Sequence, residues 1–287
     1  MSTLTSLLQS EKVVRVQTES SLKGKVALVT GGSRGIGLAT ALALVDHGAT
    51  VVTMSASAVA ADDVDERIDR HLVVDVSDFP AMETAVAEVL DRHQRIDVLI
   101  NNAGVRGVRG PIADLRTEDY FRTLQVNLLG PFHGMKLVLP NMLERGEGVI
   151  VNTSSGAGSR PRPQRSMYGS SKAALDHLTI SVAKEVAPSG VRVYSFHPGP
   201  TDTVLFNGAR YDAATPADIE ALDARFAAGE VQAPSELGEA IAWLATPSGA
   251  DFPDVIVPWS KPDKRAEIRA LAGLVAPSRV TREGNPS

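Results

Sequence analysis

Short apolar runs alternate with longer amphipathic segments along most of the chain. The short runs are rich in β-branched residues and are bounded by glycine or polar residues, which is typical of buried strands. The longer segments repeat their apolar positions at helical spacing. Strands are expected at 25–30, 50–54, 72–74, 96–100, 148–152 and 191–196, and helices at 36–48, 78–93, 117–143 and 167–187. This alternation predicts an α/β fold in which one doubly wound parallel sheet carries helices on both faces.

The alternating pattern covers residues 23–260, which we expect to form a single domain. Residues 1–22 are an N-terminal extension of mostly polar residues. Proline, glycine and a short amphipathic run interrupt the pattern at 199–233, as expected of a lid over a substrate pocket. A last strand is expected at 254–257, and a C-terminal helix and tail are expected within 261–287.

Composition excludes several functional classes. The 287 residues include 29 basic and 34 acidic side chains, so the formal charge of −5 argues against a nucleic-acid-binding protein. No apolar run is long enough to cross a membrane and no signal-peptide pattern opens the chain, so we expect a cytoplasmic protein without a membrane partner. The chain has no cysteine, and its six histidines are scattered without ligand spacing, so no metal site is expected.

A glycine-rich turn joins the first strand to the first helix. Residues 30–37 read TGGSRGIG, in which the absence of side chains lets the backbone approach a ligand closely. The helix that follows directs N–H groups and the positive end of its dipole toward an anion. This setting favours a dinucleotide pyrophosphate and a sheet of the Rossmann type. The expected contacts come from Gly31, Ser33, Arg34, Gly35, Ile36 and Gly37.

Further motifs follow this turn in a fixed order. They are Asp75-Val76, NNAG at 101–104, Asn127, Ser155, YGSSK at 168–172, and Pro198-Gly199 with Thr203. In order and spacing, residues 23–204 resemble the classical short-chain dehydrogenase/reductase (SDR) family. The resemblance implies that Asp75 contacts the adenine and that Val76 also belongs to the cofactor site. It implies that Asn102, Ala103 and Gly104 line the adenosine side, and that Pro198, Gly199, Thr201 and Thr203 hold the nicotinamide end.

The choice of dinucleotide is predicted from charge. A site that prefers NAD places a carboxylate at the end of the second strand, where it binds the ribose 2′-OH and repels a 2′-phosphate. Ser55 occupies this position, and Arg34 in the glycine turn can pair with a phosphate. NADP(H) is therefore favoured over NAD(H), which stays open as the alternative, as does a solvated role for Arg34.

Tyr168 and Lys172 lie four residues apart on a predicted helix and so project from one face. An ammonium beside a tyrosine is expected to lower its pKa, which would let Tyr168 act as a general acid in reduction and a general base in oxidation. By resemblance, Lys172 also binds the nicotinamide ribose and both residues border the cofactor. Ser155 follows a strand and can orient the substrate oxygen, and the family spacing to Tyr168 favours it over Ser154.

Asn127 completes the predicted catalytic set of Asn127, Ser155, Tyr168 and Lys172. An asparagine inside a helix is unfavourable, which suggests a special role. The resemblance implies that Asn127 kinks its helix and holds a water that links Lys172 to solvent. The expected protein is an NADP(H)-dependent oxidoreductase that interconverts a ketone or aldehyde and an alcohol. A non-catalytic dinucleotide sensor or scaffold is the alternative from another class.

Two loops near the expected substrate site are rich in arginine. They carry Arg106, Arg109, Arg160, Arg162 and Arg165. These side chains could bind an anionic substrate, although an ordinary solvated surface explains them as well. The chain lacks the C-terminal Asp-Gly-Gly element by which many family members form tetramers. A homodimer through helices 117–143 and 167–187 is therefore expected, with a homotetramer as the alternative.

Overall fold

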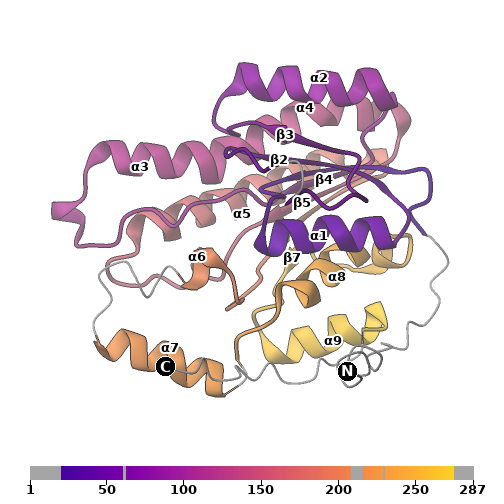
Figure 1. The fold of residues 1–287 in the computed structure, drawn as a ribbon. Helices are drawn as coiled ribbons and strands as arrows, with labels where there is room; N and C mark the ends of the chain where they lie inside the picture. Colours follow the sequence, from indigo (N-terminus) through magenta and orange to yellow (C-terminus); the bar gives the residue numbers. More distant parts are fainter. Residues whose placement is uncertain (1–20, 61–62, 208–215, 229, 275–287) are drawn as a thin grey trace, which may run out of the picture.

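Seven parallel strands form the centre of the structure, a computed structural model that describes residues 21–60, 63–207, 216–228 and 230–274 (Figure 1). The strand order is β3-β2-β1-β4-β5-β6-β7, which confirms the predicted doubly wound sheet. The strands are β1 (Val26–Thr30), β2 (Thr50–Ser55), β3 (Arg70–Val73), β4 (Val98–Asn101), β5 (Gly148–Thr153), β6 (Val191–Phe196) and β7 (Ile256–Val257). The order reverses between β1 and β4, and open α/β sheets bind their ligands at the carboxyl ends of such strands.

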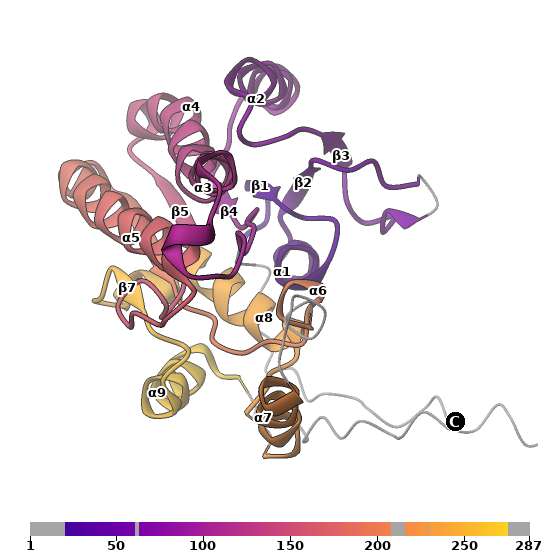
Figure 2. The same ribbon diagram turned by 90° about the vertical axis from the view of Figure 1, so that its left-hand side faces the viewer.

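Helices cover both faces of the sheet (Figure 2). One layer holds α1 (Gly35–Asp46), α8 (Pro234–Ala245) and α9 (Pro262–Ala272), and the other holds α2 (Phe79–His93), α4 (Gly130–Arg145) and α5 (Ser166–Val186). Successive strand residues face opposite layers. In β1, Ala27 packs with α1 and α8, whereas Leu28 packs with the residues of α2, α4 and α5. Both sides of each central strand are therefore buried, which explains their continuous apolar sequences.

The long helix expected at 117–143 is interrupted. It consists of α3 (Thr117–Leu124), a π-helical turn (Gln125–Leu129) and α4. Pro131 at the start of α4 has no N–H group, so it cannot complete the regular helical hydrogen bond to the carbonyl of Asn127. Single π turns occur mostly at functional sites. The helix prediction was correct for the segment as a whole but missed its division.

The segments assigned outside the domain contribute to its core. Leu22, placed in the N-terminal extension, is buried and its N–H donates to the carbonyl of His47 at 3.0 Å. Ile268 of α9 is also buried, and Arg269 pairs with Glu236 of α8. The folded unit thus reaches beyond both predicted boundaries. The rest of the predicted N-terminal extension and the end of the predicted tail, at 1–20 and 275–287, lie outside the described residues.

The described part of the predicted lid segment contains two helices. These are α6 (Val204–Asn207) and α7 (Pro216–Ala227), which are drawn below the sheet in Figure 1. The short amphipathic run in the sequence corresponds to α7. Residues 208–215, which join the two helices, lie outside the described residues.

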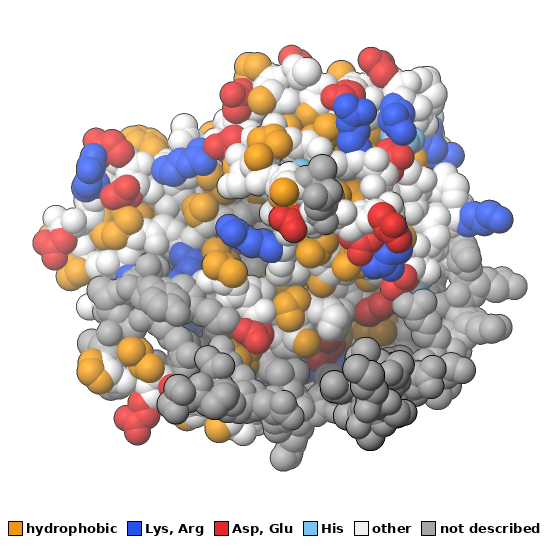
Figure 3. Space-filling view, in the orientation of Figure 1, with side chains coloured by type: hydrophobic (Ala, Val, Ile, Leu, Met, Phe, Trp, Pro, Cys, Tyr) orange, Lys and Arg blue, Asp and Glu red, His pale blue; other side chains and the backbone are white. Residues whose placement is uncertain are grey.

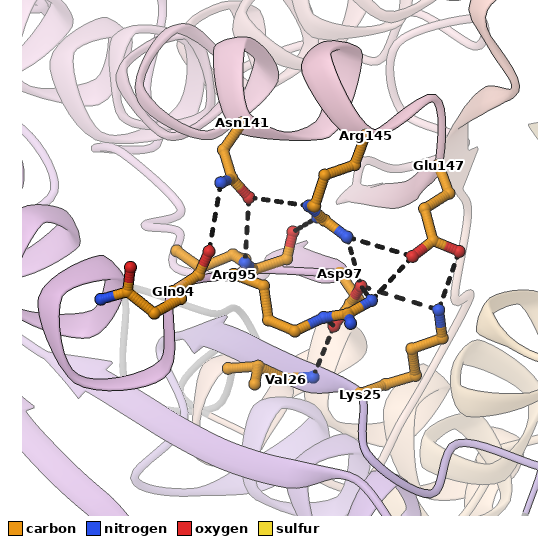
Figure 4. A network of polar contacts seen from close by, with 9 residues as sticks. Lys25, Val26, Gln94, Arg95, Asp97, Asn141, Arg145 and Glu147 are labelled. Carbon is orange, nitrogen blue, oxygen red and sulfur yellow. Dashed lines mark hydrogen bonds and ion pairs between the residues drawn. The ribbon is translucent and has the colours of Figure 1, made fainter.

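A buried carboxylate ties the amino ends of three strands together (Figure 4). Asp97 precedes β4 and accepts hydrogen bonds from the N–H of Val26 at 2.8 Å, from Arg95 Nε at 2.7 Å and from Arg145 Nη1 at 2.7 Å. Glu147, which precedes β5, accepts from Lys25 Nζ at 2.8 Å. We call Lys25, Arg95, Asp97, Arg145 and Glu147 the charged clamp. It lies at the edge opposite the expected ligand site, where it fixes strand positions.

The surface mixes charged and apolar side chains on the face drawn in Figure 3. Apolar side chains are exposed over α3, where 60% of Phe121 and 37% of Tyr120 are accessible. Phe132 and Leu143 of α4 are also exposed. Within the described ranges, none of the helices combines the length and apolar character needed to cross a membrane.

Candidate functional site

The turn between β1 and α1 brings two backbone segments very close together. Gly31 adopts a φ of +64°, which favours glycine, and a Cβ on Gly37 would lie 2.1 Å from the carbonyl oxygen of Gly31. Helix α1 begins at Gly35 with no side-chain cap and no acidic residue in its first turn. Its first N–H groups and its dipole therefore favour an anion, so the turn fits a dinucleotide pyrophosphate. Arg34 is exposed beside this turn.

The segment that follows β4 holds the glycine turn in place. Asn102 donates its side-chain N–H groups to the carbonyls of Thr30 at 3.3 Å and Gly31 at 3.2 Å. The Thr30 hydroxyl accepts from the N–H groups of Asn102 and Ala103, each at 3.1 Å. A Cβ on Gly104 would lie 3.7 Å from Lys172 Nζ. This segment therefore connects the glycine turn with the expected catalytic residues.

The end of β2 carries no carboxylate. The Ser55 hydroxyl donates to the carbonyl of Ser57 at 2.8 Å and lies 2.9 Å from Nε2 of His71. Burial lowers the pKa of His71, which favours the neutral form of its ring. A carboxylate that the sequence prediction did not consider lies nearby: Asp63 lines a small cavity together with Ser33 of the glycine turn. Its position in an irregular segment after β2 gives no recognisable sequence signal.

Asp75 follows β3 and has partners within the protein. Its carboxylate accepts from the N–H and hydroxyl of Ser77, at 3.0 and 2.7 Å, and from Arg122 Nη2 at 2.7 Å. Burial raises its pKa, but these hydrogen bonds outweigh burial and hold the pKa below its usual range. The next residue, Val76, is buried and packs against Gly130 at the start of α4.

The segment after β6 closes against the glycine turn from the other side. A Cβ on Gly35 would lie 3.3 Å from the methyl group of Thr203, so these two residues are adjacent. Gly199 has a φ of +80° and its missing Cβ would lie 3.1 Å from Ser260. Thr201 forms a parallel bridge with Gln232. Residues 198–203 are thus held between the glycine turn and the chain that follows β7.

Ser155 and Tyr168 lie together at the carboxyl end of β5. Ser155 is two residues beyond that strand, and its side chain lies close enough to the Tyr168 hydroxyl to lower the pKa of that hydroxyl. Lys172 is one helical turn further along α5, and its Nζ lies 5.9 Å from the centre of the Tyr168 ring. The competing Ser154 is buried and donates instead to the carbonyl of Lys172 at 3.2 Å. Of the two serines, Ser155 is therefore the one that adjoins Tyr168.

The π turn places Asn127 against the same group of residues. Its amide accepts from the N–H of Val105 and donates to the carbonyl of Val105, each at 2.8 Å, and it also donates to Ser171 Oγ at 3.0 Å. Lys172 Nζ donates to the carbonyl of Thr153 at 2.8 Å. The helix is therefore irregular at Asn127, and Asn127 joins the loop after β4 to α5.

The expected decrease in the pKa of Tyr168 is wrong for this structure. Burial raises the pKa of Tyr168, whereas the Ser155 hydrogen bond and the charges of Arg165 and Arg106 partly oppose that rise. Burial also lowers the pKa of Lys172 to about 8, with Asp176 as the opposing influence. The sequence prediction considered the spacing of Tyr168 and Lys172 but not their removal from water, which disfavours both charged forms.

Asp176 is a second carboxylate that the sequence prediction missed. It lies one turn beyond Lys172 on α5 and accepts from Ser195 Oγ at 2.6 Å, while its Oδ1 lies 3.0 Å from His197 Nε2. Burial raises its pKa, but the bonds to His197 and Ser195 bring the pKa below its usual range. Its four-residue spacing from Lys172 was a signal that could have identified it. Asp176 links the helix of Lys172 to the strand that leads into residues 198–203.

The fold and site define a class of protein, the oxidoreductases that bind a nicotinamide dinucleotide at the carboxyl edge of a doubly wound sheet. The short chain dehydrogenase family model matches residues 25–214. The chain belongs to this family, and it is an oxidoreductase that acts on alcohol or carbonyl groups with NAD(P). Within the described residues, no group of three or more acidic or histidine side chains is arranged to hold a metal ion.

Known relatives extend this likeness over most of the chain. The oxidoreductase UcpA of Salmonella typhimurium is 36% identical over 235 residues, which are 78% of this chain and 89% of UcpA. A cis-4-hydroxycyclohexanecarboxylate dehydrogenase of Sinomonas cyclohexanicum is 37% identical over 229 residues, covering 77% of this chain and 89% of the relative. The crystal structure of levodione reductase is 26% identical and has a TM-score of 0.78, covering 85% of this chain and 99% of that chain.

Proposed function

We propose that this protein interconverts a ketone or aldehyde and an alcohol with NADP(H), and that Tyr168 is its general acid and base. The observation that carries the proposal is the adjacency of Ser155, Tyr168 and the buried Lys172, next to a glycine turn that fits a pyrophosphate. A non-catalytic sensor or scaffold does not require this combination of side chains.

Each side chain has a separate role in the proposed reaction. A bound nicotinamide supplies or accepts the hydride. Ser155 donates a hydrogen bond to the substrate oxygen and orients it. Tyr168 gives its hydroxyl proton to that oxygen during reduction and takes the proton back during oxidation. Lys172 and Asn127 then exchange the proton with solvent. Pro198, Gly199, Thr201 and Thr203 bind at the nicotinamide end, and Asp75, Val76, Asn102, Ala103 and Gly104 bind at the adenosine end.

The preference for NADP(H) rests on the end of β2. Ser55 offers a hydroxyl where a carboxylate would repel a 2′-phosphate, and the exposed Arg34 can approach that phosphate. NAD(H) is the second candidate because Asp63 lines the cavity beside Ser33 and brings a carboxylate to the same region.

The proposed substrate is a small molecule, held beneath a lid to which α6 and α7 belong. The carboxylate in the substrate name of the Sinomonas relative supports a search among acids. We also propose a homodimer or homotetramer in the cytoplasm. The exposed Phe121, Phe132 and Leu143 of α3 and α4 support contact between copies through these helices.

To test the proposal, the purified protein is titrated in parallel with NADPH and with NADH. Binding is measured by the fluorescence of the cofactor and by the shift in melting temperature. Tighter binding of NADPH is expected, and Arg34→Gln should weaken NADPH more than NADH. Asp63→Asn is the matched variant: if NADH binds more tightly and this variant removes the preference, the NAD(H) candidate is correct. Failure to bind either dinucleotide would contradict the proposed function.

A further inference from the structure

Two loops from distant parts of the chain meet at the start of α5. The N–H of Gly110 donates to the carbonyl of Gln164 at 3.2 Å, and Arg109 Nε donates to Gln164 Oε1 at 3.3 Å. The left-handed conformation of Gln164, with φ at 60°, turns the second loop so that its carbonyl can make this contact. Gly107 packs against Met167 in the first turn of α5. The loop after β4 is therefore fixed beside the helix that carries Tyr168.

This contact concentrates positive charge around one half-buried guanidinium. Arg165 immediately precedes α5, and the charges of Arg106, Arg109 and Arg162 all act on it. In the part of the chain that the structure describes, the Arg165 guanidinium makes no hydrogen bond and no ion pair. An ionised Tyr168 acts in the opposite direction and raises the pKa of Arg165. We call Arg106, Arg109, Arg162 and Arg165 the arginine cluster.

Arg160 does not belong to this cluster. Its guanidinium folds onto the backbone of Gly156, where Nη2 lies 2.5 Å from the position of a Cβ on that glycine. The sequence pattern grouped Arg160 with its neighbours because they share a loop, but Arg160 lies against Gly156 and is not among the charges that act most strongly on Arg165. Arg160 is exposed, and this makes it a matched control for the cluster.

A half-buried cation among like charges is unfavourable unless an anion accompanies it. The first turn of α5 contains no acidic residue, and no side chain caps the helix, so its dipole adds to the positive potential. The charge of Arg165 also acts on Tyr168, which places this guanidinium near the proposed proton donor. An anionic group held there would belong to the same molecule as the reacting carbonyl.

We propose that the substrate carries an anionic oxygen group, a carboxylate or a phosphate, that binds Arg165 with the support of Arg162, Arg106 and Arg109. This rests on the proposed function and names its substrate class. A guanidinium presents paired N–H donors that match such a group. The anion holds the substrate so that its carbonyl lies between Ser155 and Tyr168, and neutral ketones lack this anchor.

Two matched pairs of probes test the proposal and distinguish the two anions. They are 4-oxocyclohexanecarboxylate with its methyl ester, and dihydroxyacetone phosphate with dihydroxyacetone. Binding to the protein with its oxidised cofactor is measured by thermal shift, so the result does not depend on turnover. For at least one pair, the charged member is expected to bind about tenfold more tightly or better, as a charge-assisted hydrogen bond provides.

Variants assign the preference to the arginine cluster. Arg165→Gln and Arg162→Gln should each reduce the preference for the charged member to about threefold or less, whereas Arg160→Gln should retain it. Arg165→Lys keeps the charge without the paired donors and should give an intermediate value. The melting temperature of each variant is also measured without a probe, to identify any variant that fails to fold. If Arg165→Gln does not fold, the result for Arg162→Gln decides whether the arginine cluster causes the preference.

Equal binding of charged and neutral probes, no binding of either charged probe, or a preference that survives both Arg165→Gln and Arg162→Gln would overturn the proposal. The proposed function fails in a different way. If the charged probes bind through the arginine cluster but no carbonyl compound is reduced with either dinucleotide, the anion site stands and the catalytic proposal does not. If neutral ketones are reduced without any preference for acids, the catalytic proposal stands and the anion site does not.

Discussion

Tyr168 shows at the scale of single residues how opposing influences set the chemistry of the site. Its burial raises the pKa, whereas the Ser155 hydrogen bond and the charges of Arg165 and Arg106 lower it. Burial also lowers the pKa of Lys172, and the negative charge of Asp176 partly offsets that decrease. Neutral Tyr168 is well suited to donate a proton to a carbonyl oxygen. Oxidation, which needs the opposite transfer, depends more strongly on these neighbouring charges.

The first prediction concerns Tyr168→Phe. The variant removes only the hydroxyl, so turnover should fall by about 10²–10⁴-fold while the affinity for NADPH stays unchanged. The measurement is the steady-state rate of carbonyl reduction, with cofactor fluorescence for binding. Tyr120→Phe is the matched control, because the exposed Tyr120 hydroxyl contacts Ser170 on the outer surface of α5 and should be dispensable. Unchanged turnover in Tyr168→Phe would contradict the acid-base role.

At the scale of elements, irregular segments position the site more than the regular ones. The π turn directs the Asn127 amide to both backbone polar groups of Val105, and this fixes the loop that leads to the arginine cluster. Helix α9 has a comparable effect elsewhere: Ile268 is buried against the core and Arg269 stacks over the ring of Trp259 at 5.7 Å. Trp259 precedes Ser260, the residue that contacts Gly199. Through this contact, α9 stabilises the segment at 198–203 that is proposed to bind the nicotinamide end.

The second prediction tests whether α9 is part of the folded unit. Ile268→Ala should lower the free energy of unfolding by about 2–4 kcal/mol, because it leaves a cavity in the core. Leu271→Ala removes a side chain of similar size from the same helix, but 55% of Leu271 is exposed, so the change should stay within about 0.5 kcal/mol. Urea denaturation of both variants measures the difference. Equal effects would show that α9 does not contribute to the core.

At the scale of the whole molecule, the two edges of the sheet have different tasks. The carboxyl edge holds the glycine turn and the proposed catalytic residues, whereas the amino edge holds the charged clamp (Figure 4). The side chain of Asp97 in that clamp is only 5% exposed. Burial raises its pKa, but hydrogen bonds from Arg95, Val26 and Arg145 outweigh burial and hold the pKa below its usual range. The clamp therefore fixes the edge of the sheet that the substrate does not use.

The third prediction concerns pH and stability. Because the folded-state pKa of Asp97 lies below the unfolded value of about 4, its contribution to stability is complete above that value and is lost as the pH falls through the folded pKa. Asp97→Asn should lower the free energy of unfolding by about 1.5–3 kcal/mol at pH 7, because it weakens the charge-assisted hydrogen bonds from Arg95 and Arg145. Among the described residues, these two arginines then keep only Glu147 as a charged partner.

The check is urea denaturation of the wild type and Asp97→Asn at pH 7, 5 and 3.5. The difference between the two proteins should be the same at pH 7 and 5 and should shrink at pH 3.5. Asp91→Asn is the control, because Asp91 is exposed on α2 and should behave like the wild type at every pH. A difference that does not change with pH would mean that the Asp97 charge does not stabilise the fold.

Local patterns in the sequence determined the order of the elements, the glycine turn and the proposed catalytic group. Strand periodicity, glycine spacing and the four-residue interval between Tyr168 and Lys172 depend on short stretches of chain, so they can be identified before folding. Local patterns did not determine the boundaries of the domain, because burial of Leu22 and Ile268 depends on residues distant in the sequence.

The tertiary structure alone decided which charges meet. It separated Arg160 from the arginine cluster, brought Asp63 beside Ser33, and enclosed Asp97 among three basic side chains. It also reversed the expected shift of the Tyr168 pKa, since burial is a property of the packed molecule. Electrostatic interactions depend on distance and on exclusion of water, and residues far apart in the sequence acquire both only when the chain is folded.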